Sequence, residues 1–220
     1  MKRLWPFGVV AAVELIGVAA DSPLLQWLAK PLLAPVLLVH LLRVRRRVDP
    51  VAVGLVFATG GDIALLLSGD TAFLVGMGCF LGTQVAFITA FLRHRRPPVV
   101  AVATYLACWV AANLVLWNHL GPLRLPVLGY SLALTLMAAA AAGVSRRVAL
   151  GGGLFLISDL LIGMDAAGAR VPGHGLAVMT TYIAALLLIT TGWVAASRAR
   201  DAGGAGDPAY TPGPVPDNAR

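Results

Sequence analysis

Long apolar runs recur along almost the whole chain, and they limit its possible folds more than any other feature. Each of eight runs has roughly 17 to 22 residues, the length that an α-helix needs to cross about 30 Å of hydrocarbon. The runs cover residues 4–20, 23–42, 50–67, 71–92, 98–118, 124–142, 148–164 and 175–196. With 59% hydrophobic and 12% charged residues, the composition excludes an ordinary soluble domain. The sequence therefore predicts an all-α protein, a polytopic membrane helix bundle of about eight transmembrane helices.

Basic residues gather at every second junction between these runs. They lie at 2–3, 43–47, 93–96, 146–147 and 198–200, with Arg220 at the end of the tail. Only Lys30, Arg124 and Arg170 fall elsewhere. Because loops rich in Lys and Arg stay in the cytoplasm, both termini and the loops after the second, fourth and sixth runs are predicted to be cytoplasmic. The basic cytoplasmic loops then explain the net charge of +7, so no nucleic-acid partner is predicted. Fifteen arginines against two lysines, with abundant Ala and Gly, favour a GC-rich bacterial genome and hence a bacterial plasma membrane.

The chain divides into a transmembrane helical bundle, residues 1–196, and a tail, residues 197–220. The tail is rich in Gly, Pro, Ala and Asp, cannot bury a core, and is expected to be disordered and cytoplasmic. The third and seventh runs resemble each other, as FATGGDIALLL and FLISDLLIG, at matching places in two sets of four. Because each set has an even number of helices, both sets would begin on the same side of the membrane. A duplication would therefore be parallel, a 4+4 arrangement about an axis along the membrane normal.

Small residues recur every fourth position on the fourth run, at Gly78, Gly82, Ala86 and Ala90. Such a ridge lets helix backbones approach closely, so we expect helix packing there.

Polar side chains within the apolar runs fall at one depth. Counted at 1.5 Å per residue, Asp62 lies about 8 Å beneath the outer end of its run, and Asp159, Glu14 and Lys30 lie at similar depths. Three further polar residues fall in or near this layer: Asn113, Tyr130 and Ser131. A carboxylate near the bilayer centre costs roughly 2.5–3.5 kcal/mol on insertion scales, so such groups should face the bundle interior and have partners.

The acidic residues of this layer admit different explanations. Glu14 and Lys30 could form a buried ion pair that joins the first two helices, or they could serve a substrate. Asp62 and Asp159 are less suited to a structural role, because two like charges near one another are poor stabilisers. We therefore predict Asp62 and Asp159 as catalytic residues, with Lys30, Glu14, Asn113, Tyr130 and Ser131 as substrate-binding candidates. The histidines are isolated and no Cys-x-x-Cys spacing occurs, so neither a metal site nor a cofactor is predicted.

Six short segments carry a resemblance to a known family. KPLLAP (30–35), GGDIALLL (60–67), FLGTQVAF (80–87), YSLALTLM (130–137), GGLFLISDLL (152–161) and YIAALLLI (182–189) are similar, in order and spacing, to the successive signatures of YhhN/TMEM86 proteins. Characterised members are lysoplasmalogenases, which hydrolyse the vinyl-ether bond of lysoplasmalogens to an aldehyde and a glycerophospho-base. The resemblance implies a lysophospholipid substrate and matches Lys30, Asp62, Tyr130 and Asp159 to family positions.

The chain also departs from that family. Gln84 stands where many members have His, Phe87 where they have Tyr, and Leu186 where Gln is common. If the His takes part in proton transfer, Gln84 cannot replace it.

Carboxyl chemistry suits vinyl-ether hydrolysis. One of Asp62 and Asp159 would protonate the β-carbon, and the other would stabilise the resulting cation and activate water. A second function class is open, a proton-coupled transporter or lipid translocase that uses the same carboxylates. Transporters usually place their sites near the midplane, whereas this polar layer is off-centre. A purely structural scaffold would leave the clustered acids unexplained.

Overall fold

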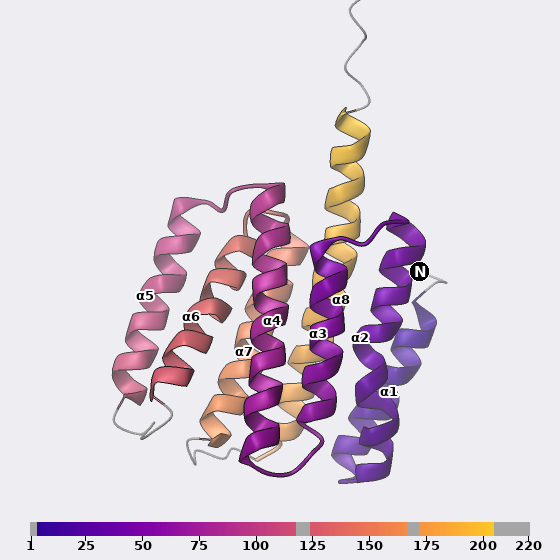
Figure 1. Cartoon of the computed structure of the whole chain (residues 1–220), viewed down its shortest axis with the longest axis vertical. Coiled ribbons are helices and arrows are strands. Elements are labelled where there is room, and N and C mark those ends of the chain that lie inside the picture. Colours follow the sequence, from indigo (N-terminus) through magenta and orange to yellow (C-terminus); the bar gives the residue numbers. More distant parts are fainter. Residues whose placement is uncertain (1–3, 118–123, 167–171, 205–220) are drawn as a thin grey trace, which may run out of the picture.

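The computed structural model describes residues 4–117, 124–166 and 172–204, and within these ranges the chain forms eight α-helices. Their bounds are α1 Trp5–Ala19, α2 Pro23–Arg45, α3 Pro50–Ala64, α4 Asp70–His94, α5 Val99–Leu116, α6 Arg124–Ala141, α7 Arg146–Ala166 and α8 His174–Gly204. The predicted all-α polytopic bundle is confirmed (Figure 1).

Five of these helices are long and apolar enough to cross a membrane: α2, α4, α6, α7 and α8. The other three are apolar but shorter. Two of them, α1 and α3, have 15 residues each, which spans only about 22 Å at 1.5 Å per residue. The sequence-based bounds 4–20 and 50–67 overestimated both helices, because hydropathy continues into turn residues that have left the helix.

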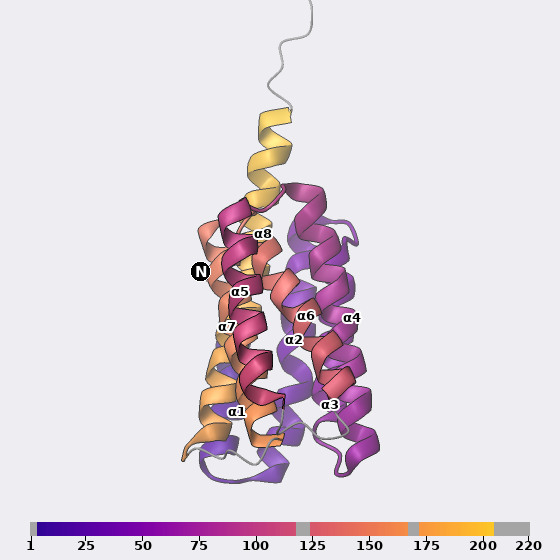
Figure 2. The ribbon, with the colours of Figure 1, turned by 90° about the vertical axis from the view of Figure 1, so that its left-hand side faces the viewer.

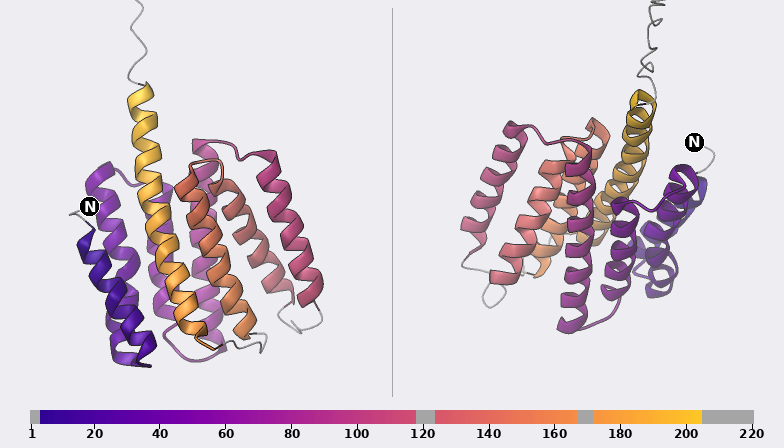
Figure 3. Two further views of the ribbon diagram at one scale, coloured as in Figure 1. Left: turned by 180° about the vertical axis from the view of Figure 1, so that it is seen from behind. Right: turned by 45° about the horizontal axis from the view of Figure 1, so that its top comes forward.

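The helices form two layers around a shared apolar core. In Figure 1, α3 and α4 lie in front and pack on each other, while α7 and α8 pack on each other behind them. The left panel of Figure 3 shows the bundle from behind. There α7 and α8 lie in front, with α1 and α2 at one edge and α5 at the other. Figure 2 shows α5 nearest the viewer, and α6 contacts α4, α5 and α7. The pairing of α3 with α4 and of α7 with α8 is what a 4+4 duplication would produce, and the duplication stays a prediction.

The start of α3 is fixed by a single side chain. Asp49 lies just before Pro50 and accepts a hydrogen bond from the backbone N–H of Ala52 at 3.1 Å, as expected of an N-cap. The other Asp49 oxygen accepts the indole N–H of Trp193 on α8 at 2.8 Å. Ser22 stands in the same position before Pro23 but makes no side-chain cap. One carboxylate therefore begins α3 and joins it to α8.

Close helix approach occurs where small residues cross. A methyl group added at Gly151 on α7 would lie 2.9 Å from the backbone nitrogen of Ile189 on α8, and one at Gly192 would lie 2.8 Å from the Val148 side chain. The ridge predicted on α4 is used in part. A methyl group at Gly82 would lie 2.7 Å from the Phe57 ring, whereas Gly78 has nothing within 4 Å.

The last helix corrects the predicted boundary of the tail. Residues 197–204 were expected to be disordered, yet α8 continues to Gly204 and projects beyond the bundle (Figure 1). Arg45 Nη1 binds Asp201 Oδ2 at 2.6 Å, and Arg200 Nη1 donates to the backbone oxygen of Arg93 at 3.0 Å. These contacts from α2 and α4 explain the extra turns. Residues 205–220 lie outside the described ranges.

Candidate functional site

Asp62 on α3 is buried, with 1% of its surface exposed. Its Oδ2 accepts a hydrogen bond from the Tyr182 hydroxyl of α8 at 2.8 Å, across 120 positions of sequence. Its Oδ1 is also buried but has no hydrogen-bond partner in the described residues. The preceding Gly61 makes room for the neighbouring ring, because a methyl group there would lie 2.7 Å from Phe80. Tyr182 thus holds one oxygen of Asp62 in place, and the other oxygen is available to bind a proton or another group.

Asp159 on α7 has a corresponding partner. Its Oδ2 accepts a hydrogen bond from the hydroxyl of Tyr130, which lies on the neighbouring α6. Asp159 is less completely buried than Asp62. Each carboxyl therefore holds one tyrosine hydroxyl, but the two differ in their access to the surroundings.

Three aromatic rings connect the two carboxyls. Phe80, Phe155 and Tyr182 contact one another edge to face, with ring centroids 5.8 to 6.2 Å apart. Phe155 lies one helical turn before Asp159, so both face the same side of α7. The Tyr182 hydroxyl binds Asp62, and the Tyr182 ring contacts Phe155 on the Asp159 side of α7. The structure therefore brings both predicted catalytic carboxyls to one cluster between the helix layers.

Glu14 and Lys30 lie beside this cluster. Glu14 on α1 is completely buried, and neither of its carboxyl oxygens has a hydrogen-bond partner in the described part of the chain. Lys30 on α2 interacts electrostatically with both Glu14 and Asp62. No ion pair within 4.0 Å joins Lys30 to Glu14 among the residues that the structure describes. Lys30 therefore interacts with both carboxyls electrostatically, and it forms no direct ion pair with either one among the described residues.

Gln84 is a second completely buried polar side chain in the core. It is completely buried on α4, yet neither atom of its amide has a hydrogen-bond partner in the described residues. Its side chain lies next to the Tyr130 hydroxyl and one turn after Phe80. An unpaired buried amide costs about 1–3 kcal/mol, so a hydrogen bond from water or from the nearby Tyr130 hydroxyl would stabilise this side chain. Phe87 and Leu186, the other two departures from the family pattern, are completely buried and serve packing.

Asn113 and Ser131 have other partners. The Asn113 amide donates to the Trp109 backbone oxygen at 2.9 Å within α5. The Ser131 hydroxyl of α6 accepts the Trp109 indole N–H at 2.9 Å and donates to the Leu128 backbone oxygen at 3.2 Å. In the described residues, neither side chain hydrogen-bonds to Asp62 or Asp159. Their bonds are explained by the packing of α5 on α6.

Tyr182 was missed as a site residue. It opens the motif YIAALLLI, which carried part of the family resemblance, and its position at the start of an otherwise apolar segment was the available signal. A buried tyrosine hydroxyl usually finds a partner, but the sequence does not say which one.

The arrangement can perform acid–base chemistry. Two carboxyls have one oxygen each fixed by a tyrosine donor, and unpaired polar atoms of Asp62, Gln84 and Glu14 lie buried around them. Among the described residues, no group of three His, Cys, Asp or Glu side chains is placed to hold a metal ion.

Comparisons with known proteins identify relatives. Residues 25–193 match the model of the YhhN family. The chain is 35% identical over 139 residues to lysoplasmalogenase TMEM86B of Homo sapiens, across 62% of this chain and 59% of the human protein. It is 32% identical over 194 residues to a lysoplasmalogenase of Mycobacterium tuberculosis, across 82% of this chain and 73% of that protein. The alignment thus spans about three fifths of the human relative's length. No solved structure gives a significant match.

Proposed function

Because the chain belongs to the YhhN family, we propose that it is a membrane-embedded hydrolase that cleaves the vinyl-ether bond of lysoplasmalogen-like lysophospholipids. The observation that carries this proposal is the pair of carboxyls, Asp62 and Asp159, each bound by a tyrosine hydroxyl from another helix. The names of the human and mycobacterial relatives supply the substrate class.

The reaction needs one proton donor and one activated water. A carboxyl group transfers its proton to the β-carbon of the double bond, which leaves an oxocarbenium ion on the carbon next to the ether oxygen. Water adds to that carbon, and its proton passes to a carboxylate. The resulting hemiacetal collapses to an aldehyde and frees the glycerol hydroxyl. One water is consumed, and the paired carboxylates stabilise the cation as they do in glycosidases.

The surroundings of the two carboxyls suggest different roles. Asp62 has a buried Oδ1 with no partner in the described residues, and this oxygen is suited to carry the proton that the double bond receives. Asp159 is less buried and is suited to accept the proton of the attacking water. Tyr182 and Tyr130 would fix the orientation of each carboxyl by donating to its other oxygen.

Lys30 is the candidate for binding the phosphate. Lys30 is only partly buried and makes no ion pair within 4.0 Å in the described residues, so its ammonium can attract an anion. The apolar tail of the lipid would lie between the helices and enter from the outer leaflet. Glu14 lies near Lys30 and would hold the ammonium in place at long range.

The test is aldehyde release from a purified lysoplasmalogen by the wild type and by the variants Asp62→Asn and Asp159→Asn. An amide keeps the shape but removes the transferable proton and the charge, so each variant should lose about 10² to 10⁴-fold in rate. Asp70→Asn is the matched control, because Asp70 is exposed at the start of α4, and it should keep the wild-type rate. Size-exclusion profiles must show that all variants are folded.

Two results would contradict the proposal. Full hydrolysis by both variants would show that other residues carry the chemistry. A well-folded wild type that releases no aldehyde, but moves protons or lipid across vesicles in an Asp62-dependent manner, would establish the transporter alternative.

A further inference from the structure

A groove on the surface of the bundle lies between α1 and α2, away from the carboxyl cluster. Its volume is about 690 Å³, and its lining includes Trp5, Pro35, Val36, Val39, His40 and Arg43. This volume is within the usual range of about 300–1,000 Å³ for small-ligand sites. The walls are mostly apolar, and Arg43 lies at the end of the bundle that also carries Arg45, Arg46 and Arg47.

The residues that line the groove on α2 extend over most of the depth of one lipid leaflet. Pro35 lies near the middle of the 23-residue α2, and Arg43 lies near its C-terminal end. The step of eight positions from Pro35 to Arg43 rises about 12 Å, most of the half-thickness of a hydrocarbon core of about 30 Å. An acyl chain seated along Val36 and Val39 would therefore end in a head group at the depth of Arg43.

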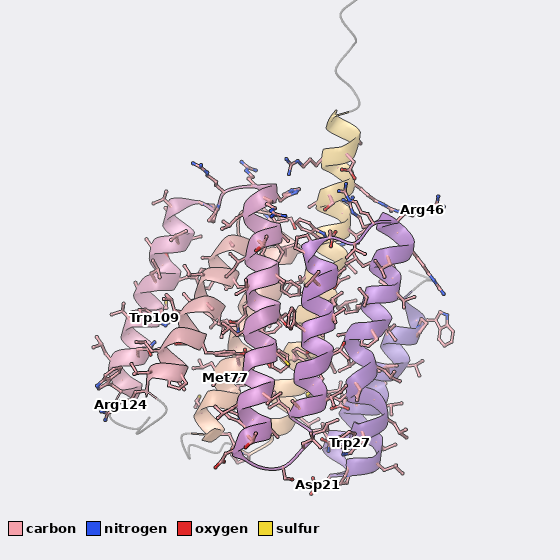
Figure 4. The ribbon with its side chains drawn as sticks, in the orientation of Figure 1. Asp21, Trp27, Arg46, Met77, Trp109 and Arg124 are labelled. Carbon is pink, nitrogen blue, oxygen red and sulfur yellow. The ribbon has the colours of Figure 1, made fainter. Side chains whose placement is uncertain are left out.

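The ends of the two helices place interfacial residues at that depth. Trp5 is the first residue of α1, opposite Arg43 because α1 and α2 are consecutive and antiparallel, and it is 69% exposed. Trp is enriched at the membrane interface, where its ring lies at the level of the head groups. Figure 4 shows Arg46 at the same end of the bundle, with Asp21 and Trp27 at the opposite end.

The charged residues that line the groove favour an anionic head group. Arg43 is exposed and makes no ion pair within 4.0 Å in the described part of the chain, whereas its neighbours Arg45 and Arg47 bind Asp201. A guanidinium matches a phosphate with two parallel hydrogen bonds. No acidic residue is among those that line the groove, so nothing there would receive the ammonium group of a zwitterionic lipid.

We propose that this groove binds an anionic glycerophospholipid from the leaflet at the arginine-rich end of the bundle, with its phosphate on Arg43 and one acyl chain along Pro35, Val36 and Val39. Anionic lipids are concentrated in the cytoplasmic leaflet, and the arginine-rich end is the one predicted to face the cytoplasm. The candidate catalytic cluster lies toward the other end, so the proposal does not depend on the hydrolase activity.

The experiment compares phosphatidylglycerol with phosphatidylcholine of the same acyl chains, titrated onto the purified full-length protein and followed by native mass spectrometry. The wild type should bind phosphatidylglycerol more tightly. Arg43→Gln should weaken that binding about 10- to 100-fold, the loss expected when one charged hydrogen-bonding partner is removed. Arg146→Gln is the matched control, an exposed arginine at the same end that does not line the groove, and it should bind as the wild type does.

A second variant tests the apolar part of the site. Val39→Trp should fill the groove and abolish tight binding while Arg43 is intact, so a folding defect in Arg43→Gln would not prevent the test. Equal affinity of the wild type for the two lipids would overturn the proposal. So would wild-type affinity in Arg43→Gln or Val39→Trp, or an equal loss in Arg146→Gln.

Discussion

At the scale of single residues, two tyrosine hydroxyls hold the buried carboxyls. Tyr182→Phe leaves Asp62 Oδ2 buried without its donor, so the free energy of unfolding should fall by about 1–3 kcal/mol. The rate of hydrolysis should fall as well. The double variant Tyr182→Phe with Asp62→Asn should be no slower than Asp62→Asn alone, because both substitutions disrupt the same hydrogen-bonded pair. Tyr105→Phe, on α5, is the control for losing a hydroxyl. Additive losses in the double variant would show that Tyr182 acts independently of Asp62.

Gln84 allows stability and activity to be separated at one position. Gln84→Leu removes a buried amide that has no partner among the described residues, so the midpoint of thermal unfolding in detergent should stay the same or rise. If the amide orients water or substrate beside Tyr130, the rate of aldehyde release should fall in the same variant. Gln26 is partly buried and its amide donates to the Gly17 backbone oxygen at 3.5 Å. Gln26→Leu should therefore not raise the midpoint and should leave the rate of aldehyde release unchanged. A clear loss of thermal stability in Gln84→Leu would mean that the amide is already satisfied.

At the scale of elements, the contact between α7 and α8 positions Tyr182 relative to Asp159. A methyl group at Gly151 would lie within 3.0 Å of backbone atoms of α8, and backbone cannot move aside as a side chain can. Gly151→Ala should therefore lower the free energy of unfolding by about 1–3 kcal/mol, the usual range for overpacking. Gly153→Ala, two residues along the same helix, would contact only the Tyr105 hydroxyl at 3.5 Å and should be neutral. Equal thermal unfolding of the two variants would contradict this account.

At the scale of the whole molecule, the basic segments converge on one end of the bundle. Arg45 reaches Asp201 on α8, Arg200 reaches the end of α4, and a methyl group at Gly143 would lie 3.0 Å from the Arg95 backbone oxygen. The positive-inside rule predicts that this end faces the cytoplasm. Reporter fusions after Arg47, Arg96 and Arg147 should all give a cytoplasmic signal. A signal from the outer side of the membrane at any one of them would overturn the predicted topology.

Several features followed from the sequence because they depend on local properties. The length of each apolar run predicts a helix, and seven of the eight helices end within four residues of the predicted bounds. Depth along a helix is also local, since it needs only a count of residues at 1.5 Å each. Counting alone therefore placed Asp62 and Asp159 in one layer, and both carboxyls lie in one cluster of the structure.

The hydrogen-bond partners of those residues could be identified only in the tertiary structure. Which side of a helix faces which neighbour depends on the rotation and packing of whole helices, and no local pattern records it. Tyr182 therefore emerged as the donor to Asp62 only when α8 was placed behind α3, and Asn113 and Ser131, at a suitable depth, proved to bond within α5 and α6. The same limit explains the extra turns of α8. Hydropathy ends near residue 196, but Arg45 on α2 binds Asp201 and supports the helix beyond it.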